Sequence, residues 1–172
     1  IWLQTLLEHC EILAHANIIE LPAGEDSKEW EILSHVFGQL MEDRADKKIW
    51  IINVGGGTIT DVGGMIASLY KRGVSFIHVP TTLMGMVDAS IGGKNGINFQ
   101  GNKNMLGTFQ EPDALLIYPG FLDTLPEAEI LSGLAEMLKH ALIADPALWE
   151  ALTDLEEIDA NHLKPFIKQN IR

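Results

Sequence analysis

The chain has very little cysteine, with Cys10 alone among 172 residues. An internal disulfide is therefore excluded, and this usage fits a reducing compartment. Long hydrophobic runs are also missing, since none reaches the roughly 20 residues that a membrane-spanning helix needs. The first residues carry neither the basic region nor the cleavage-like site of a signal peptide. We therefore expect a soluble, cytoplasmic protein with no membrane partner.

Basic residues are scarce, with 12 Lys and Arg against 24 Asp and Glu and a net charge of −12. This field repels a phosphate backbone, so we expect no nucleic-acid partner, although a few lysines can still form a local anion site. Hydrophobic residues at 47% and charged residues at 21% are ordinary for a globular domain with a core. The chain begins at Ile1 rather than Met, and we expect a fragment of a longer protein.

Hydrophobic periodicity predicts alternating helices and strands up to about residue 125. Helices are expected over 2–15, 26–44 and 61–71, and strands over 17–21, 48–54, 74–79 and 115–118. The stretch 48–79 reads as strand, glycine-rich turn, helix and strand. Such a βαβ unit requires parallel strands and a right-handed crossover.

Beyond Pro126 the pattern contains helices only. They are expected over 127–144, 146–155 and 163–171. The sequence therefore predicts a Rossmann-like α/β domain at 1–125 with a parallel sheet, followed by the start of an all-helical domain at 126–172.

The first chemical motif is the glycine-rich turn Gly55–Asp61. Glycines at the end of a buried strand let a ligand approach the backbone, and the N-terminus of the next helix attracts phosphate. Thr60 stands where Gly-x-Gly-x-x-Gly has its last glycine, and no Gly-Lys-Ser/Thr follows, so a nucleotide triphosphatase loop is excluded. Two interpretations stay open, a phosphate site or a tight turn without ligand. Asp61 could be only the N-cap of the helix.

The second motif, Pro80–Asn98, mixes hydroxyls, an acid, glycines and one lysine, and is too polar for a packed core. It follows a strand, so it lies at the same sheet edge as the glycine-rich turn, where open α/β sheets bind ligands. Lys94 and Lys103 in this acidic chain indicate an anion site, although each lysine alone is more often a solvated surface residue.

The third motif, Gly133–His140, lies on an apolar predicted helix. Glu136 and Lys139 are three residues apart and share a face. They could be a structural ion pair, which is slightly favoured without other evidence. The alternative is a metal-binding carboxylate beside a substrate-binding ammonium. We expect His140 on a different face, and the other histidines show no metal-ligand spacing.

Together these segments resemble the dehydroquinate synthase family over roughly residues 24–150. The phrases that carry the resemblance are Gly55–Asp61, Lys71–Gly73, Pro80–Met84, Val87–Lys94, Gly101–Phe109 and Leu134–Lys139. The resemblance implies a cyclase that converts 3-deoxy-D-arabino-heptulosonate 7-phosphate to 3-dehydroquinate and phosphate in the shikimate pathway. NAD oxidises a ring hydroxyl of this phosphorylated sugar acid, phosphate is eliminated, and the hydride is then returned. A divalent metal, zinc or cobalt, assists.

The resemblance also implies roles for individual residues. The cofactor contacts would be Glu25, Lys28, Gly56, Gly57, Thr58, Asp61, Thr81, Thr82, Met84, Lys103, Phe121, Thr124, Leu125 and Glu129. Asp88, Lys94, Asn104 and Lys139 would hold the substrate, and Glu136 would bind the metal. Arg72 would reach the phosphate site of the partner in a homodimer.

A single carboxylate cannot hold a catalytic zinc ion, which needs three protein ligands. The resemblance implies two histidine ligands beyond residue 172 and a first strand before Ile1, so the chain alone is expected to be inactive. Three alternatives stay open: another sugar-phosphate cyclase of the inosose or valiolone type, a glycerol-dehydrogenase-like enzyme, and a non-catalytic NAD-binding or dimerisation module.

Overall fold

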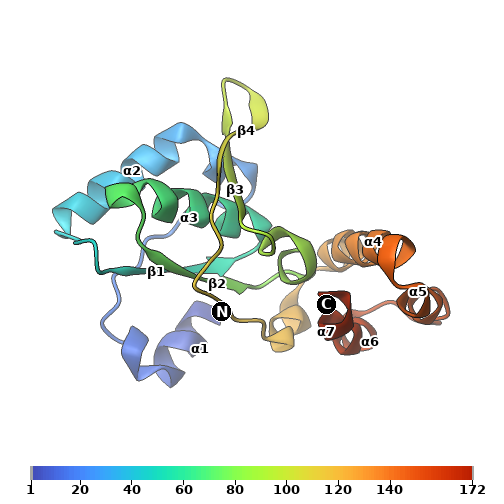
Figure 1. Ribbon diagram of the computed structural model, residues 1–172. Helices are drawn as coiled ribbons and strands as arrows, with labels where there is room; N and C mark the ends of the chain where they lie inside the picture. The colour runs from blue at the N-terminus through green and yellow to red at the C-terminus, as the bar shows by residue number, and fades with distance from the viewer. Residues whose placement is uncertain (1, 172) are drawn as a thin grey trace.

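The computed structural model describes residues 2–171, and a parallel sheet forms its centre (Figure 1). Strand β1 (Trp50–Gly55) leads through helix α3 (Gly57–Leu69) to strand β2 (Ser75–Pro80). The two strands pair in parallel from Trp50↔Ser75 to Gly55↔Pro80, and β5 (Ala114–Leu115) joins the other edge of β2. The predicted α/β class with a parallel sheet is confirmed.

Helix α3 packs closely on both of its faces because it carries two adjacent glycines. A Cβ atom at Gly63 would lie 1.9 Å from Asn53 Oδ1 of β1, and one at Gly64 would lie 1.7 Å from Asn95 Oδ1. Neither gap holds a methyl group, so these glycines set the distance from α3 to the sheet on one side. On the other side they set its distance to the strand that contains Asn95.

That strand belongs to a hairpin that the periodicity did not predict. Strands β3 (Lys94–Phe99) and β4 (Asn102–Phe109) pair antiparallel and form a separate two-stranded sheet beside α3 (Figure 1). Gln100 and Gly101 have φ values of 50° and 76°. Two left-handed residues in a row are the geometry of a two-residue hairpin turn. Most of β4 is exposed on both faces, so it lacks the alternation that identifies a strand from sequence.

The N-terminal third departs most from the sequence prediction. Helix α1 (Trp2–His9) and the 3₁₀ turn η1 (Glu11–Leu13) replace one helix over 2–15. The strand predicted over 17–21 is wrong, because this segment has no strand partner in the described sheets. The helix predicted over 26–44 is divided into η2 (Glu25–Lys28) and α2 (Trp30–Glu42), because Glu29 is extended.

Two smaller boundaries also differ. Helix α3 begins at Gly57 with Gly56 as its N-cap, so Asp61 lies inside the helix and the N-cap interpretation of Asp61 is wrong. The strand predicted over 115–118 is reduced to Ala114–Leu115, the two residues that pair with β2.

The remaining described chain is helical, as predicted after residue 126. A 3₁₀ segment, η5 (Pro119–Thr124), leads into α4 (Glu127–Ala144) and α5 (Pro146–Thr153). The last predicted helix is divided into α6 (Ala160–Leu163), η6 (Lys164–Phe166) and α7 (Ile167–Asn170). Pro165 lies at this break, and it lacks the backbone N–H that a continuous helix needs.

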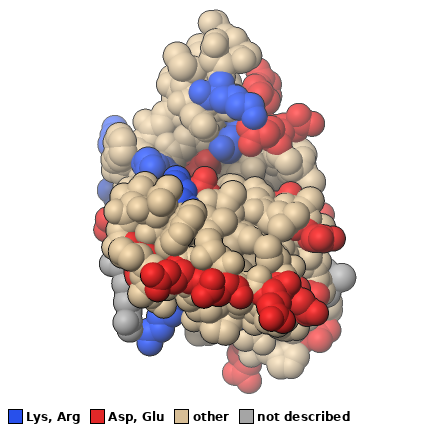
Figure 2. Space-filling model, turned by 90° about the vertical axis from the view of Figure 1, so that its right-hand side faces the viewer, with Lys and Arg blue, Asp and Glu red and all other residues tan. Residues whose placement is uncertain are grey.

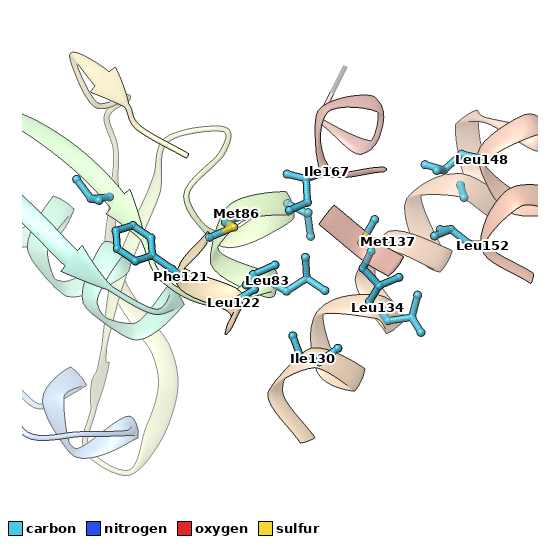
Figure 3. Packing of buried hydrophobic residues seen from close by; sticks show 14 residues of the cluster. Leu83, Met86, Phe121, Leu122, Ile130, Leu134, Met137, Leu148, Leu152 and Ile167 are labelled. Carbon is cyan, nitrogen blue, oxygen red and sulfur yellow. The ribbon is translucent and has the colours of Figure 1, made fainter. Parts of the chain in front are cut away.

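One apolar cluster joins the sheet side to these helices (Figure 3). Leu83 and Met86, at the π-helical turn η4 (Gly85–Ala89), are fully buried against Leu122, Leu134 and Met137. The same cluster continues outward to Leu148, Leu152 and Ile167. The turn that follows β2 is therefore fixed between the sheet and α4.

None of the helices formed by residues 2–171 has the length and apolarity required to cross a membrane. On the face that carries α4–α7, acidic side chains form a row, and a group of basic side chains lies above it, toward the hairpin (Figure 2). The chain's net charge of −12 is therefore unevenly distributed.

Candidate functional site

The ends of β1 and β2 meet at one sheet edge and hold two loops in contact. Thr81 N donates to Gly55 O at 2.8 Å. A Cβ at Gly56 would lie 2.9 Å from Thr82 Cγ2, and one at Gly57 would lie 2.9 Å from Ala89 Cβ. The glycines let the N-terminus of α3 sit directly against the turn that follows β2. The structure thus brings together the glycine turn and Thr82, which sequence alone placed only at a common edge.

A buried lysine forms the second part of the site. Lys28 Nζ lies 2.6 Å from Asp61 Oδ2 and donates to Asn104 Oδ1 at 3.2 Å. The Lys28 side chain is only 8% exposed. Burial raises the pKa of Asp61, and the hydrogen bond and charge of Lys28 oppose that rise only in part. Lys28 therefore ties η2 to α3 and to the hairpin.

Neighbouring predicted residues are more exposed. Lys103 Nζ lies 3.4 Å from Glu25 Oε2, and both side chains face solvent. Asn104 has a φ of 53°, an unusual conformation for a residue other than glycine, and its backbone N–H donates to Asn98 Oδ1 at 3.1 Å. The side-chain amide of Asn104, a predicted substrate contact, therefore binds Lys28, a predicted cofactor contact. Both roles stay predictions.

The third part of the site is a polar cluster between η4 and α4. Carboxylate oxygens of Asp88 and Glu136 and a ring nitrogen of His140 lie within 4.8 Å of one another. Lys139 Nζ contacts Glu136 Oε2 and lies 3.7 Å from Asp88 Oδ1. The hydrogen bond to Glu136, and then the charge of Asp88, raise the pKa of Lys139.

His140 is the residue that the sequence interpretation misplaced. It was expected on a different face of the helix from Glu136, but its Nε2 lies 3.3 Å from Asp88 Oδ1 inside the cluster. The spacing gave the signal, because residues four apart on a helix are neighbours. Glu136 and His140 have this spacing.

The donor set of this cluster fits a divalent cation. Glu136 Oε2 is buried and, apart from its ion pair with Lys139, has no hydrogen-bond partner among residues 2–171. A buried carboxylate oxygen that meets only the ammonium of Lys139, beside an imidazole and a second carboxylate, belongs to the kind of donor set that zinc and cobalt take. A second group of acids with a histidine, Glu157, Asp159 and His162, is exposed, and within residues 2–171 it has no comparable buried oxygen.

The other predicted site residues lie around these three parts. Thr58, Thr81 and Met84 are half-buried near the glycine turn, whereas Lys94 is exposed at the start of β3. Arg72 is exposed at the end of η3 (Tyr70–Arg72), where a φ of 63° sets it in a left-handed turn.

Phe121 is a core residue, 5.1 Å from the Trp2 ring in an edge-on contact. Thr124 Oγ1 accepts a hydrogen bond from Trp2 Nε1 at 2.8 Å. Leu125 is half-buried, and Glu129 is exposed in the first turn of α4. The predicted cofactor roles of these four residues stay predictions.

Comparison with known proteins gives consistent matches. A family model described as 3-dehydroquinate synthase N-terminal matches residues 18–132. The 3-dehydroquinate synthase of Sulfurovum sp. (strain NBC37-1) is 41% identical over 169 residues, which cover 98% of this chain and 48% of the relative. The chain therefore spans about half the length of the curated relatives it matches.

Solved structures give the same fold. ValA, a 2-epi-5-epi-valiolone synthase from Streptomyces hygroscopicus subsp. jinggangensis 5008 with NAD⁺ and Zn²⁺ bound, is 34% identical with a TM-score of 0.78, covering 98% of this chain and 47% of its own. A 2-deoxy-scyllo-inosose synthase is 26% identical with a TM-score of 0.87, covering 99% and 49% respectively.

Proposed function

The chain belongs to the 3-dehydroquinate synthase family, and we propose that it supplies the NAD-binding half and the metal-binding carboxylate of such an enzyme. The complete protein would convert 3-deoxy-D-arabino-heptulosonate 7-phosphate to 3-dehydroquinate and phosphate. One observation carries the proposal. Within the single segment 81–89, Thr82 lies against the glycine turn and Asp88 lies near Glu136 and Lys139, so the proposed cofactor site and the proposed metal site would lie at its two ends.

The glycine turn and Lys28 would hold the cofactor. The bare N-terminus of α3 suits a pyrophosphate, because free N–H groups and the helix dipole both attract anions. Lys28 keeps Asp61 in place within α3. The proposed cofactor contacts are Glu25, Lys28, Gly56, Gly57, Thr58, Asp61, Thr81, Thr82, Met84, Lys103, Phe121, Thr124, Leu125 and Glu129.

When bound, NAD would take and return the hydride, and the metal ion would polarise the hydroxyl that is oxidised. The chain's own residues bind and orient the substrate. Lys139 and Lys94 bring positive charge to a phosphorylated acid, and Asp88 can accept a hydrogen bond from a ring hydroxyl. Asn104 would complete the contacts, and Glu136 would hold the metal with two histidines from outside this chain.

Three wider features belong to the same proposal. The enzyme would act in the cytoplasm as a homodimer, with the exposed Arg72 reaching the partner's phosphate site. Residues 1–125 would form the NAD-binding domain, and residues 126–172 would begin the helical domain. The whole enzyme, rather than this chain alone, would be active.

A second candidate has one observation in its favour, the 34% identity to a valiolone synthase structure. Such a cyclase would use the same cofactor turn and metal carboxylate and differ in the substrate pocket. Asp88, Lys94 and Asn104 match the dehydroquinate pattern. Offering each sugar phosphate to the full-length protein separates the two candidates by which one releases phosphate.

Glu136→Gln in the full-length protein tests the metal assignment. The amide keeps the size of the side chain but loses the anionic donor, so Co²⁺ affinity should fall at least about tenfold and phosphate release should be lost. NAD affinity, measured by fluorescence titration, should change less than about twofold. Glu127→Gln, an exposed acid on the same helix, is the matched control. Normal turnover with unchanged Co²⁺ binding would refute the assignment.

Lys94→Ala tests the substrate anion site. Lys94 is exposed at the start of β3, so its loss should leave the fold intact. The substrate KM should rise about tenfold, because a charged hydrogen bond to an anion is lost. Lys168→Ala, another exposed lysine, controls for the loss of one surface charge. Kinetics equal to those of the control would make Lys94 an ordinary surface residue.

A further inference from the structure

We infer that Asn98 is a positioning residue, whose side chain holds a bulge of β4, residues 103–105, so that Lys103 and Asn104 both turn toward η2. The inference rests on the proposed function, because it gives a support to residues of that same site. Asn98 is not among the residues to which the resemblance assigns a contact. The register, backbone and burial of the hairpin carry the inference.

The bulge interrupts the pairing of the two hairpin strands. The register of β3 with β4 shifts between Ile97 and Phe99, so Asn98 alone lies opposite residues 103–105. Extra residues of this kind bend a strand and change the direction in which its side chains point. Bulges are common beside active sites for that reason.

The bulge brings two consecutive side chains to the same side. In a regular strand Lys103 and Asn104 would point to opposite faces. Here Lys103 Nζ lies 3.4 Å from Glu25 Oε2, and Asn104 Oδ1 accepts from Lys28 Nζ at 3.2 Å. Glu25 and Lys28 both belong to η2. A predicted cofactor contact and a predicted substrate contact thus face one element.

The backbone of Asn104 needs support in this conformation. Its φ of 53° is left-handed, which is unfavourable for a residue with a Cβ atom. Asn98 Oδ1 accepts a hydrogen bond from the backbone N–H of Asn104 at 3.1 Å. Lys28 binds only the side chain of Asn104, so Asn98 is the residue that holds its backbone.

Burial makes this hydrogen bond effective. Asn98 is 6% exposed, so water competes little for its oxygen. Ile97 and Asn98 are consecutive and both buried, whereas a regular strand would turn one of them outward. The side chain of Asn98 is therefore directed inward at the bulge.

The test is Asn98→Ala in the full-length enzyme with Co²⁺ and saturating NAD. Without the acceptor, fewer molecules hold Asn104 in the binding conformation, and apparent substrate affinity falls by that fraction. The KM for the seven-carbon sugar phosphate should rise about tenfold, as for one lost hydrogen bond. Bound substrate selects the competent state, so kcat should change less than about twofold. Asn98→Asp keeps an acceptor oxygen in place, and its KM should stay within about threefold of the unchanged protein.

Two variants control for other effects of the substitution. Asn98→Leu removes the acceptor but fills the space, so a matching rise in KM does not depend on a cavity. Asn102→Ala changes an exposed asparagine of the same hairpin, whose Nδ2 donates to Gln100 O at 3.2 Å, and should leave KM unchanged. Equal KM values in Asn98→Ala and Asn102→Ala would overturn the inference. So would a rise in Asn98→Asp as large as that in Asn98→Ala.

Asn104→Ala shows whether Asn98 acts through Asn104. The double variant with Asn98→Ala should have the KM of Asn104→Ala alone, whereas independent effects would multiply. If Asn104→Ala leaves KM unchanged, Asn104 does not hold substrate, and its proposed substrate role and the inference both fall. If Asn104→Ala raises KM while Asn98→Ala matches the control, the inference alone is overturned.

Hydrogen exchange gives a readout that needs no activity. The amide hydrogen of Asn104 should exchange at least about tenfold faster in Asn98→Ala, because its acceptor is gone, but not in Asn98→Asp. Unchanged exchange in Asn98→Ala would overturn the inference even if the enzyme acts on another sugar phosphate.

Discussion

At the scale of single residues, Lys28 should have a large effect on stability. It is buried, and it is the partner that both Asp61 and Asn104 face. Lys28→Met should lower the free energy of unfolding by about 3 kcal/mol at neutral pH, because removing one partner leaves a buried charge uncompensated. Urea denaturation of the full-length protein measures this loss. Lys103→Met, at an exposed ion pair, is the control and should cost under about 1 kcal/mol.

The stability lost in Lys28→Met should depend on pH in a definite direction. Burial raises the pKa of Asp61 even with Lys28 present, and without Lys28 the pKa must rise further. A carboxyl with a raised folded-state pKa stabilises the fold at low pH and loses that contribution as pH rises through the folded pKa. Lys28→Met should therefore lose more stability at pH 7 than at pH 4. An equal loss at both values would contradict the account.

For His78 we expect the opposite pH dependence, in which the free energy of unfolding falls as the pH falls. It is 2% exposed in β2, its Nδ1 lies 3.2 Å from Asn53 Nδ2, and burial lowers its pKa to about 4. A base with a lowered folded-state pKa contributes stability above its unfolded pKa of about 6.5 and loses it as pH falls toward 4. The free energy of unfolding should drop on the order of 3 kcal/mol over that window. His78→Gln should flatten this slope, and an unchanged slope would exclude His78 as its source.

At the scale of elements, the close packing of α4 against the turn after β2 depends on Gly133. A Cβ there would lie 2.5 Å from Leu83 Cβ and 2.8 Å from Met84 N. Gly133→Ala should destabilise the protein by about 1–3 kcal/mol, because backbone cannot move aside as a side-chain tip can.

Gly38→Ala is the matched substitution within α2, where an added Cβ meets nothing within 4 Å. It should stabilise the protein by up to about 1 kcal/mol, since alanine is the better helix former. Thermal unfolding of the two variants should therefore shift in opposite directions. A similar shift for both would contradict the packing described for α4.

The elements also show how far sequence reasoning reaches. The βαβ unit was predictable because buried strands and a glycine-rich turn leave strong local patterns. The β3–β4 hairpin was not, because β4 is exposed on both faces and its turn uses Gln100 rather than a common turn pair. Segment 17–21 carries a strand-like pattern, but pairing depends on distant chain and not on local composition.

Some residues of the candidate site were likewise predictable from sequence, and others were not. The glycine turn, Asp88, Glu136 and Lys139 could be found from motifs, because each motif is a short contiguous phrase. The role of Lys28 as a link to Asn104 could not, since residues 76 positions apart meet only in the folded hairpin. His140 could have been found from its spacing to Glu136, whereas its bond with Asn170 spans 30 positions and two helices.

At the scale of the whole molecule, the chain spans about half the length of its relatives. The elements proposed to bind the cofactor are grouped at one sheet edge, and the side chains proposed to bind the metal lie at the junction with α4. We propose that these two sites act together in a cyclase, which uses NAD without consuming it. A dehydrogenase with the same fold would consume NAD instead.

The decisive experiment measures phosphate release and NADH concentration in the same reaction. The full-length protein is given the seven-carbon sugar phosphate with far less NAD than substrate. For a cyclase we expect phosphate release over many turnovers for each NAD, with no net accumulation of NADH. Accumulation of NADH in step with substrate loss, or no phosphate release from a protein that binds both NAD and Co²⁺, would contradict it.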